Sequence, residues 1–165
     1  MKSRTASSTH KKVVILSFDR NSLKGYLNPA LLGHSEAVDI LTLDGEHHSV
    51  ALDAIKGVYF VREFEEPFEP ERKSFLSRPK LDGLWVRLRF RDDDEVEGIV
   101  RNDLLELVDG GVQLIPPDLH GNVLRMFVPR VALAEMKVLG VVGIARRQPQ
   151  ADKTASASQS KLFGE

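Results

Sequence analysis

The chain has 165 residues, of which 42% are hydrophobic and 28% charged, and it contains no cysteine. This length allows one or two domains with a buried core, and the lack of cysteine excludes disulfide bonds and thiolate chemistry. No apolar run approaches the ~20 residues that a membrane-spanning helix needs, so we expect a cytoplasmic protein without membrane contact.

The two ends of the chain differ from its middle. Residues 1–12 are rich in Ser, Thr and Lys, and residues 144–165 are mostly polar, with Ala-Ser repeats. Both are predicted to be disordered tails, because they offer little apolar surface to bury. The tails carry more bases than acids, which leaves an acidic body, whereas nucleic-acid binders usually present a basic face. We therefore expect nucleic acid to be a disfavoured partner.

Two apolar stretches make up the body. We expect a first repeat over 13–63, a proline-rich connector over 64–83, and a second repeat over 84–143. The connector contains Pro67, Pro70 and Pro79, and prolines at this density break regular structure.

The two stretches share the same order of features: an apolar strand, an acidic turn, a second strand with a glycine, and later strands. The matched positions are Val13, Asp19, Gly25, Ile40 and Leu41 with Val86, Asp92, Gly98, Leu114 and Ile115. Near the end of each copy, Ile55-Lys56 is matched with Met136-Lys137. Residues 131–138 also fit a helix, but the match favours a short turn followed by a strand.

Short strands dominate both copies. Val86, Leu88 and Phe90 alternate with arginines, which is typical of a strand with one buried face. Closely spaced strands with glycine bends predict a mainly β fold of two tandem small β-barrels. The order of strands and turns in each copy resembles the Sm-like and SH3-like small barrels. The alternative is that the strands pool into one sandwich. If the repeats satisfy each other's edge strands the protein is a monomer, and open edges favour a homodimer.

The segment Lys56-Gly57-Val58-Tyr59-Phe60-Val61 resembles a Lys-Ala-Val-Phe-Phe-Val motif of an uncharacterised bacterial domain family. Lys24-Gly25-Tyr26 and Phe127-Val128 also resemble that family's pattern. Some members accompany PilZ domains, the receptors for cyclic di-GMP, so the resemblance implies a bacterial regulatory setting and no known reaction. A PilZ ligand site itself is disfavoured, because Arg20 stands where that motif has an acid before Ser22 and Gly25.

No catalytic, cofactor or metal site stands out. His47 and His48 are adjacent, and neighbouring strand residues point to opposite faces, so both rarely reach one ion. The acidic run 92–95 lacks the spaced oxygen ligands of a calcium loop and is predicted to be a solvated turn. We therefore expect a protein that is not an enzyme.

Two sets of residues are candidates for binding. Trp85, Arg87, Arg89 and Arg91 lie in phase on one expected strand, where they could stack on and neutralise single-stranded nucleic acid. The alternative, which the acidic body favours, is that these arginines pair with acids across the sheet. In the tail, Gln159, Leu162 and Phe163 resemble the Gln-x-x-Leu-Phe peptide that docks onto the bacterial sliding DNA clamp.

The sequence thus predicts a non-enzymatic interaction or regulatory module with a protein partner and binding surfaces at loops or in the groove between the repeats. One alternative is RNA or cyclic-dinucleotide binding by a barrel surface. The other is sliding-clamp docking through the C-terminal tail.

Overall fold

The computed structural model describes residues 9–70, 72–106 and 110–143, and within them the fold is mainly β, with no α-helix. The ten strands are β1 (Lys11–Ser17), β2 (Ser22–Leu27), β3 (Ala37–Thr42), β4 (His47–Ala51), β5 (Ile55–Val61), β6 (Gly83–Phe90), β7 (Glu95–Val100), β8 (Gly111–Leu114), β9 (Val123–Pro129) and β10 (Leu133–Val142). Short 3-10 helices include η1 (Pro29–Leu31), η2 (Leu52–Ala54) and η4 (Arg130–Ala132). We call β1 to β5 the first half and β6 to β10 the second half. The segment that joins them runs over 62–82, between the end of β5 and the start of β6, and it is called the connector from here on in place of the expected range 64–83.

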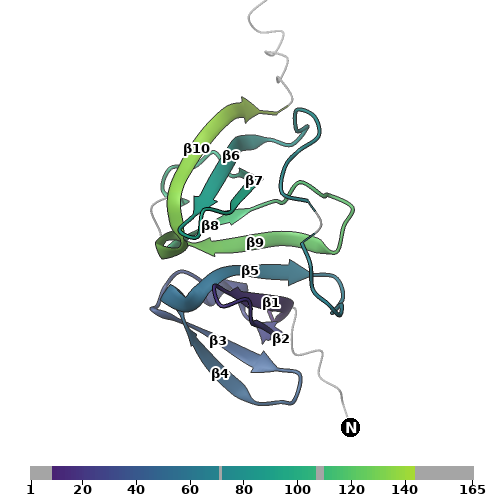
Figure 1. Cartoon of the computed structure of the whole chain (residues 1–165), viewed down its shortest axis with the longest axis vertical. Helices are drawn as coiled ribbons and strands as arrows, with labels where there is room; N and C mark the ends of the chain where they lie inside the picture. Colours follow the sequence, from purple (N-terminus) through teal and green to yellow (C-terminus); the bar gives the residue numbers. More distant parts are fainter. Residues whose placement is uncertain (1–8, 71, 107–109, 144–165) are drawn as a thin grey trace, which may run out of the picture.

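The strands form two antiparallel sheets (Figure 1). The larger sheet has the order β4-β3-β2-β1-β5-β9-β8, and the smaller has the order β10-β6-β7. A single bridge between Ile99 and Ile115 links β7 to the chain just after β8. Hydrogen bonds therefore run without a break in strand order from β4 at one end of the molecule to β10 at the other.

Neither half closes into a barrel of its own within the described residues, so the two separate closed barrels expected from the sequence are not confirmed. The reason lies at β5 and β9. The free side of β5 hydrogen-bonds to β9 of the other half, with Val58 opposite Phe127 and Phe60 opposite Arg125. A strand edge that finds a partner in the other half no longer needs one in its own.

Burial explains why some strands have a continuous apolar sequence and others alternate between apolar and polar residues. β1 and β5 lie inside the large sheet, and their side chains are buried on both faces: Val13 and Ile15 pack into one core, whereas Val14 packs into the other. A strand covered on both faces shows a continuous apolar run, as β5 does. β6 instead alternates, with Val86 and Leu88 fully buried and Arg87 exposed.

The core consists of two clusters that both cross the boundary between the halves. One contains the inner residues of the second half together with Val14, Tyr59 and Val61 of the first. The other belongs to the first half and receives Phe127 from β9. The halves therefore share buried surface and do not pack as separate units.

Residues 131–138 form the end of η4 and the start of β10, so the expected turn followed by a strand is confirmed. The expected turn at Asp44-Gly45 joins β3 to β4, and Gly45 has the positive φ of 84° that such a turn favours. Among the described residues, no helix has the length and apolar character needed to cross a membrane.

Candidate functional site

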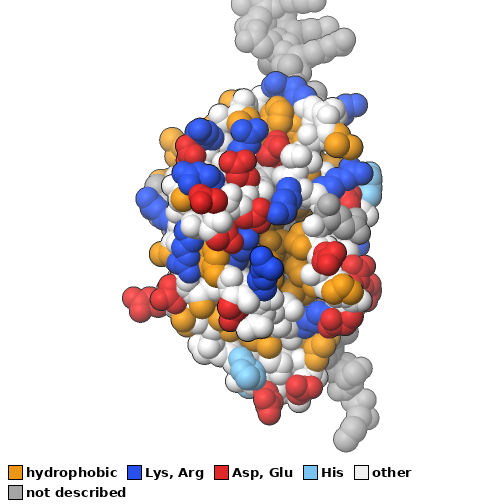
Figure 2. Space-filling model, in the orientation of Figure 1, with side chains coloured by type: hydrophobic (Ala, Val, Ile, Leu, Met, Phe, Trp, Pro, Cys, Tyr) orange, Lys and Arg blue, Asp and Glu red, His pale blue; other side chains and the backbone are white. Residues whose placement is uncertain are grey.

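A groove between the two halves, beside the connector, is the candidate functional site, and we call it the inter-half groove. It has a volume of about 210 Å³. Figure 2 shows hydrophobic side chains in the middle of this face, with Lys, Arg, Asp and Glu around them. The apolar walls are Leu16 and Tyr59 of the first half, Phe68 and Pro70 of the connector, and Phe90, Val96, Val123 and Met126 of the second half.

Polar contacts fix the connector along one side of the groove. The Asn122 side chain accepts a hydrogen bond from the Glu63 amide and donates one to the Glu63 carbonyl, each at 2.9 Å. On the other flank, the Lys24 ammonium contacts the Glu65 carbonyl and the Glu66 carboxylate. These contacts tie the start of the connector to β2 of the first half and to the loop before β9 of the second.

Three phenylalanines of the connector pack edge-on against an aromatic residue of the sheets. The ring centroids of Phe64 and Tyr26 are 5.7 Å apart, and those of Phe68 and Tyr59 are 5.1 Å apart. Phe75 approaches Trp85 in the same way, at 6.3 Å. Edge-to-face aromatic pairs of this kind add about 0.5–1.5 kcal/mol each beyond their burial. The connector is therefore an integral part of the fold.

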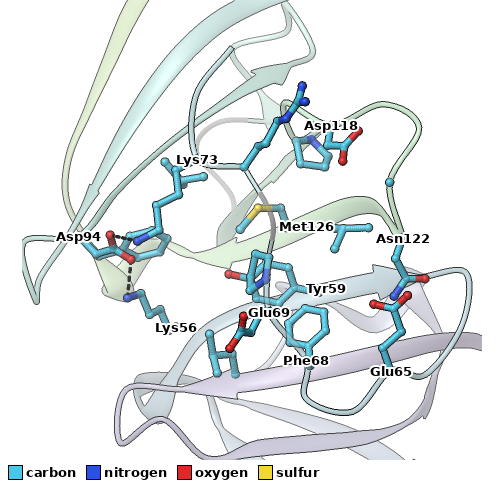
Figure 3. A pocket seen from close by; sticks show the side chains of 18 residues that line it. Lys56, Tyr59, Glu65, Phe68, Glu69, Lys73, Asp94, Asp118, Asn122 and Met126 are labelled. Carbon is cyan, nitrogen blue, oxygen red and sulfur yellow. Dashed lines mark hydrogen bonds and ion pairs between the residues drawn. The ribbon is translucent and has the colours of Figure 1, made fainter. Parts of the chain in front are cut away.

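The charged rim of the groove is partly neutralised by its own ion pairs. The Lys56 ammonium lies 2.8 Å from a carboxylate oxygen of Asp92 and 2.9 Å from one of Asp94. The Lys73 ammonium lies 2.6 Å from the other oxygen of Asp94. In Figure 3, Lys56, Lys73 and Asp94 stand together on one side, while Glu65, Asn122 and Asp118 stand on the other.

These ion pairs shift the pKa values of their members. Burial alone disfavours the charge on Lys56, but its hydrogen bonds to Asp92 and Asp94 outweigh burial and raise the pKa of Lys56. Burial alone would raise the pKa of Asp94, but hydrogen bonds from Lys73 and Lys56 outweigh it and lower that pKa. Each shift favours the charged form, so the cluster is fully ionised at neutral pH.

Other rim carboxylates have no cationic partner. Glu65 and Glu69 make no ion pair with any described residue. Arg72 also lines the groove and makes no ion pair with a described residue, but the carboxylates of Glu65, Glu69 and Asp118 are likewise without one. The charge left over on the rim is therefore negative and favours a cationic group beside the apolar groove.

Tyr59 supplies a polar group in the apolar part of the groove. Its side chain is buried, and burial together with the negative charge of Asp94 raises the pKa of the phenol, which therefore stays protonated. The hydroxyl has no hydrogen-bond partner among the described residues, and it is not fully sealed from solvent. It is thus available as a donor or acceptor to a group that enters the groove.

The structure places the residues predicted for nucleic-acid binding on β6 and in the turn that follows it. Trp85, Arg87 and Arg89 lie on β6, whereas Arg91 lies in the turn after it. The Trp85 indole N–H donates to a carboxylate oxygen of Glu97 at 2.7 Å. Arg87 lies opposite Glu97 in the β6–β7 ladder and is exposed.

Arg89 and Arg91 are engaged within the protein. The Arg89 guanidinium contacts Asp93 at 3.2 Å and, at 3.4 Å, Glu135, which lies opposite it in the β6–β10 ladder. Arg91 lies with its guanidinium carbon 4.0 Å from the Phe18 ring centroid and donates to the Asp53 carbonyl. Arg91 therefore joins the turn after β6 to the first half.

The remaining candidates do not contribute to the groove. Gln159, Leu162 and Phe163 lie outside the described residues. His47 and His48 are neighbours on exposed β4, and His48 lies 3.4 Å from Glu46. Within the described part of the chain, no group of three or more His, Asp or Glu residues is arranged to hold a metal ion.

A groove between the repeats was among the binding surfaces expected from the sequence, but its residues were not identified, because they come from five separate segments. One usable signal was the set of phenylalanines in the connector, Phe64, Phe68 and Phe75, since a solvated linker seldom carries so many aromatic residues. Nothing in the sequence indicated that Tyr59 and Met126 would lie together.

The fold and the groove define a mainly β protein of two antiparallel sheets with an apolar site between its halves. Residues 9–140 match a family of unknown function, DUF6982, and the chain belongs to that family. This agrees with the expected membership in an uncharacterised family. No curated protein and no solved structure matches the chain.

Proposed function

We propose that the protein is a non-enzymatic interaction module, in a bacterial regulatory setting, whose inter-half groove binds an aromatic or aliphatic side chain of a protein partner. The observation that carries this proposal is the apolar wall formed by Tyr59, Phe68 and Met126, with internally paired lysines at the rim. Concave apolar sites with a few polar groups are the usual form of a binding pocket.

The charges on the rim select the flanking residues of that partner. Lys56 and Lys73 are already neutralised, while Glu65 and Glu69 are not. The preferred occupant is therefore an apolar side chain next to Lys or Arg. The same pattern disfavours cyclic dinucleotides and RNA, because the unpaired carboxylates outnumber Arg72, the one lining cation without an ion pair among the described residues, and phosphates need a basic surface.

The two halves are, in this proposal, copies of one small-barrel unit of the Sm-like or SH3-like type. The pairing supports this interpretation at each step of the first hairpins: the β1–β2 ladder runs from Lys11–Leu27 through Val13–Gly25, and the β6–β7 ladder from Leu84–Val100 through Val86–Gly98. The turns agree as well, since Arg20 and Asp93 occupy the same place and both have positive φ, 69° and 68°.

The last strand of each half adds further support. Each follows a 3-10 helix, and each begins with a bulge that skips one residue: Lys56 is skipped between Ile55 and Gly57, and Ala134 between Leu133 and Glu135. This correspondence pairs Ile55 with Leu133, three residues before Met136, with which the sequence alignment had matched it.

Binding in the groove is tested with two blocked tripeptides, Lys-Trp-Lys and Glu-Trp-Glu, followed by NMR of the labelled full chain. We expect Lys-Trp-Lys to bind more tightly and to shift the amide signals of Tyr59, Val123 and Met126. Val123→Trp fills the groove and should abolish these shifts. Leu124→Trp is the matched control, because the neighbouring Leu124 is exposed and does not line the groove.

Equal binding of both peptides, or shifts that persist in Val123→Trp, would exclude the groove as the site. A chain that ends at Gln150 distinguishes groove binding from clamp docking through the tail. Docking through Leu162 and Phe163 should be lost on truncation, whereas peptide binding in the groove should not change.

A further inference from the structure

Two strand edges remain unpaired in the described part of the chain, and they lie at opposite ends of the molecule. β4 pairs only with β3, and β10 pairs only with β6 (Figure 1). An exposed strand edge presents free N–H and C=O groups that another chain can pair with. Each of these edges can therefore pair with a strand of another chain.

The joint between the halves shows how two such edges fit together. β5 ends the first half, β9 is the edge strand of the second half on its other side, and the two pair antiparallel. Within the halves, β5 corresponds to β10 and β9 corresponds to β4, because each pair occupies the same place in the strand order. β10 and β4 are therefore the strands that correspond to β5 and β9 but have a free outer edge. A joint of the same kind would pair β10 of one molecule with β4 of another.

We propose that β4 of one molecule pairs antiparallel with β10 of a second copy, which repeats the β5–β9 joint between chains. The register follows from the ladders. Val58 lies opposite Phe127 in the internal joint. By the β1–β5 and β6–β10 ladders, Met136 has the same position in the second half as Val58 has in the first. By the β3–β4 and β8–β9 ladders, Ser49 has the same position in the first half as Phe127 has in the second. Ser49 of one copy thus lies opposite Met136 of the next.

The side chains along the two edges fit this arrangement. In the same register, Val138 lies opposite His47, and Val138 is 55% exposed in the single chain. Glu46 then lies near Gly140 of the second copy, where the guanidinium of Arg78 donates to the Val141 carbonyl. The contact therefore covers an exposed apolar side chain and brings a carboxylate to a guanidinium.

The contact uses two different surfaces, so it is heterologous and builds a ring or an open chain of molecules. The register rests on the correspondence between the halves proposed above and is independent of the groove. A chain that does not self-associate would leave the proposed peptide binding in the groove unaffected. A groove that binds no peptide would likewise leave the proposed β4–β10 contact unaffected.

Crosslinking tests the register directly, because the chain has no cysteine of its own. A full chain with Ser49→Cys and Met136→Cys is treated with a short bis-maleimide and run on a denaturing gel. We expect a ladder of multimers from the double variant, a dimer from a mixture of the two single variants, and monomer from either single variant alone. Leu31→Cys with Met136→Cys is the matched control, because Leu31 is exposed but belongs to η1 and to neither edge strand, and this variant should stay monomeric.

Light scattering provides the second measurement. The mass of the wild-type chain should rise above 18.4 kDa with concentration, and Val138→Asp should weaken association about tenfold, corresponding to about 1.4 kcal/mol. Val131→Asp makes the same change at another exposed valine, outside β10, and should associate normally. A wild-type chain that stays monomeric at all concentrations, a crosslink in the Leu31→Cys control, or a crosslink from one single variant alone would overturn the proposal.

Discussion

Gly25 and Gly98 each lie where the second strand of a half passes closest to the third. Gly25 is opposite Val13 in the β1–β2 ladder, and a Cβ atom on it would lie 2.2 Å from the Leu41 carbonyl oxygen. Gly98 is opposite Val86, and a Cβ atom there would lie 2.0 Å from a terminal carbon of Leu114. The two glycines share a position in the proposed correspondence of the halves, but a Cβ atom would meet different obstacles: a backbone carbonyl at Gly25 and the end of a side chain at Gly98.

We predict that Gly25→Ala destabilises the protein more than Gly98→Ala. A backbone carbonyl moves only if the strand moves, whereas Leu114 can change rotamer, although the Ile115 carbonyl at 3.1 Å also limits Gly98. Overpacking of this kind costs about 1–3 kcal/mol, and we expect Gly25→Ala at the upper end. Urea unfolding measures the difference, with Gly140→Ala as control, since its nearest neighbours are 3.9 Å away. Equal losses at both glycines would contradict the prediction.

The sequence was sufficient to predict the parts of the fold that depend on local pattern. Gly25 and Gly98 could be matched because a hairpin with a close strand crossing needs glycine at one fixed place. Closure of each half could not be predicted, because it depends on whether the free edge of β5 meets its own half or β9. That choice is made between segments that are far apart in sequence, and the alternation of apolar residues is the same in both outcomes.

Lys56 connects the bulge of β5 to the acidic turn of the second half, and its removal should change how stability depends on pH. We predict that Lys56→Met lowers the free energy of unfolding by about 1 kcal/mol at pH 7. The lowered pKa of Asp94 stabilises the folded state. This stabilisation is fully present above pH 3.8, the ordinary pKa of an aspartate, and is lost as the pH falls through the lower pKa of the folded state. The raised pKa of Lys56 gives a contribution that is present below 10.5 and lost as the pH rises through the folded-state value.

The difference between wild type and Lys56→Met should therefore be constant near neutral pH and shrink below about pH 4. Chemical unfolding at several pH values measures it. Lys73→Met is the control: the Lys73 side chain is 62% exposed and contacts Asp94 but not Asp92, so its effect should be smaller. A gap that stays constant down to pH 2 would show that the two carboxylates do not interact with Lys56 as described.

The three arginines of the predicted nucleic-acid surface should not contribute to RNA binding. We predict that joint replacement of Arg87, Arg89 and Arg91 by Ala leaves the affinity for a labelled oligouridine unchanged, because Arg89 and Arg91 are held by contacts within the protein. Fluorescence anisotropy measures the affinity. Replacement of Arg20, Lys80 and Arg130 removes the same charge elsewhere and is the matched control. A loss confined to the first set would establish the surface as an RNA site.

The candidate site was less predictable than the fold. Trp85 and Arg89 were singled out because alternation on one strand is visible in the sequence, but their partners Glu97 and Glu135 depend on which strands become neighbours. The groove depends on tertiary packing alone. The clearest sign of it in the sequence was Phe68, an aromatic residue in a segment that otherwise has the composition of a polar, proline-rich linker.

Asn122 should control the local stability of the connector. We predict that Asn122→Ala, which removes both hydrogen bonds to Glu63, increases amide hydrogen exchange at residue 63 about tenfold. Two hydrogen bonds of about 0.5–1.5 kcal/mol each are lost, whereas the effect on global unfolding should be small because Glu63 is exposed and water replaces them. Asn28→Ala is the matched control: Asn28 also bonds a backbone amide, that of Ala30 at 3.1 Å, but lies far from the connector in the sequence. Exchange that rises equally in both variants would mean that Asn122 acts on the whole fold and does not hold the connector beside the groove.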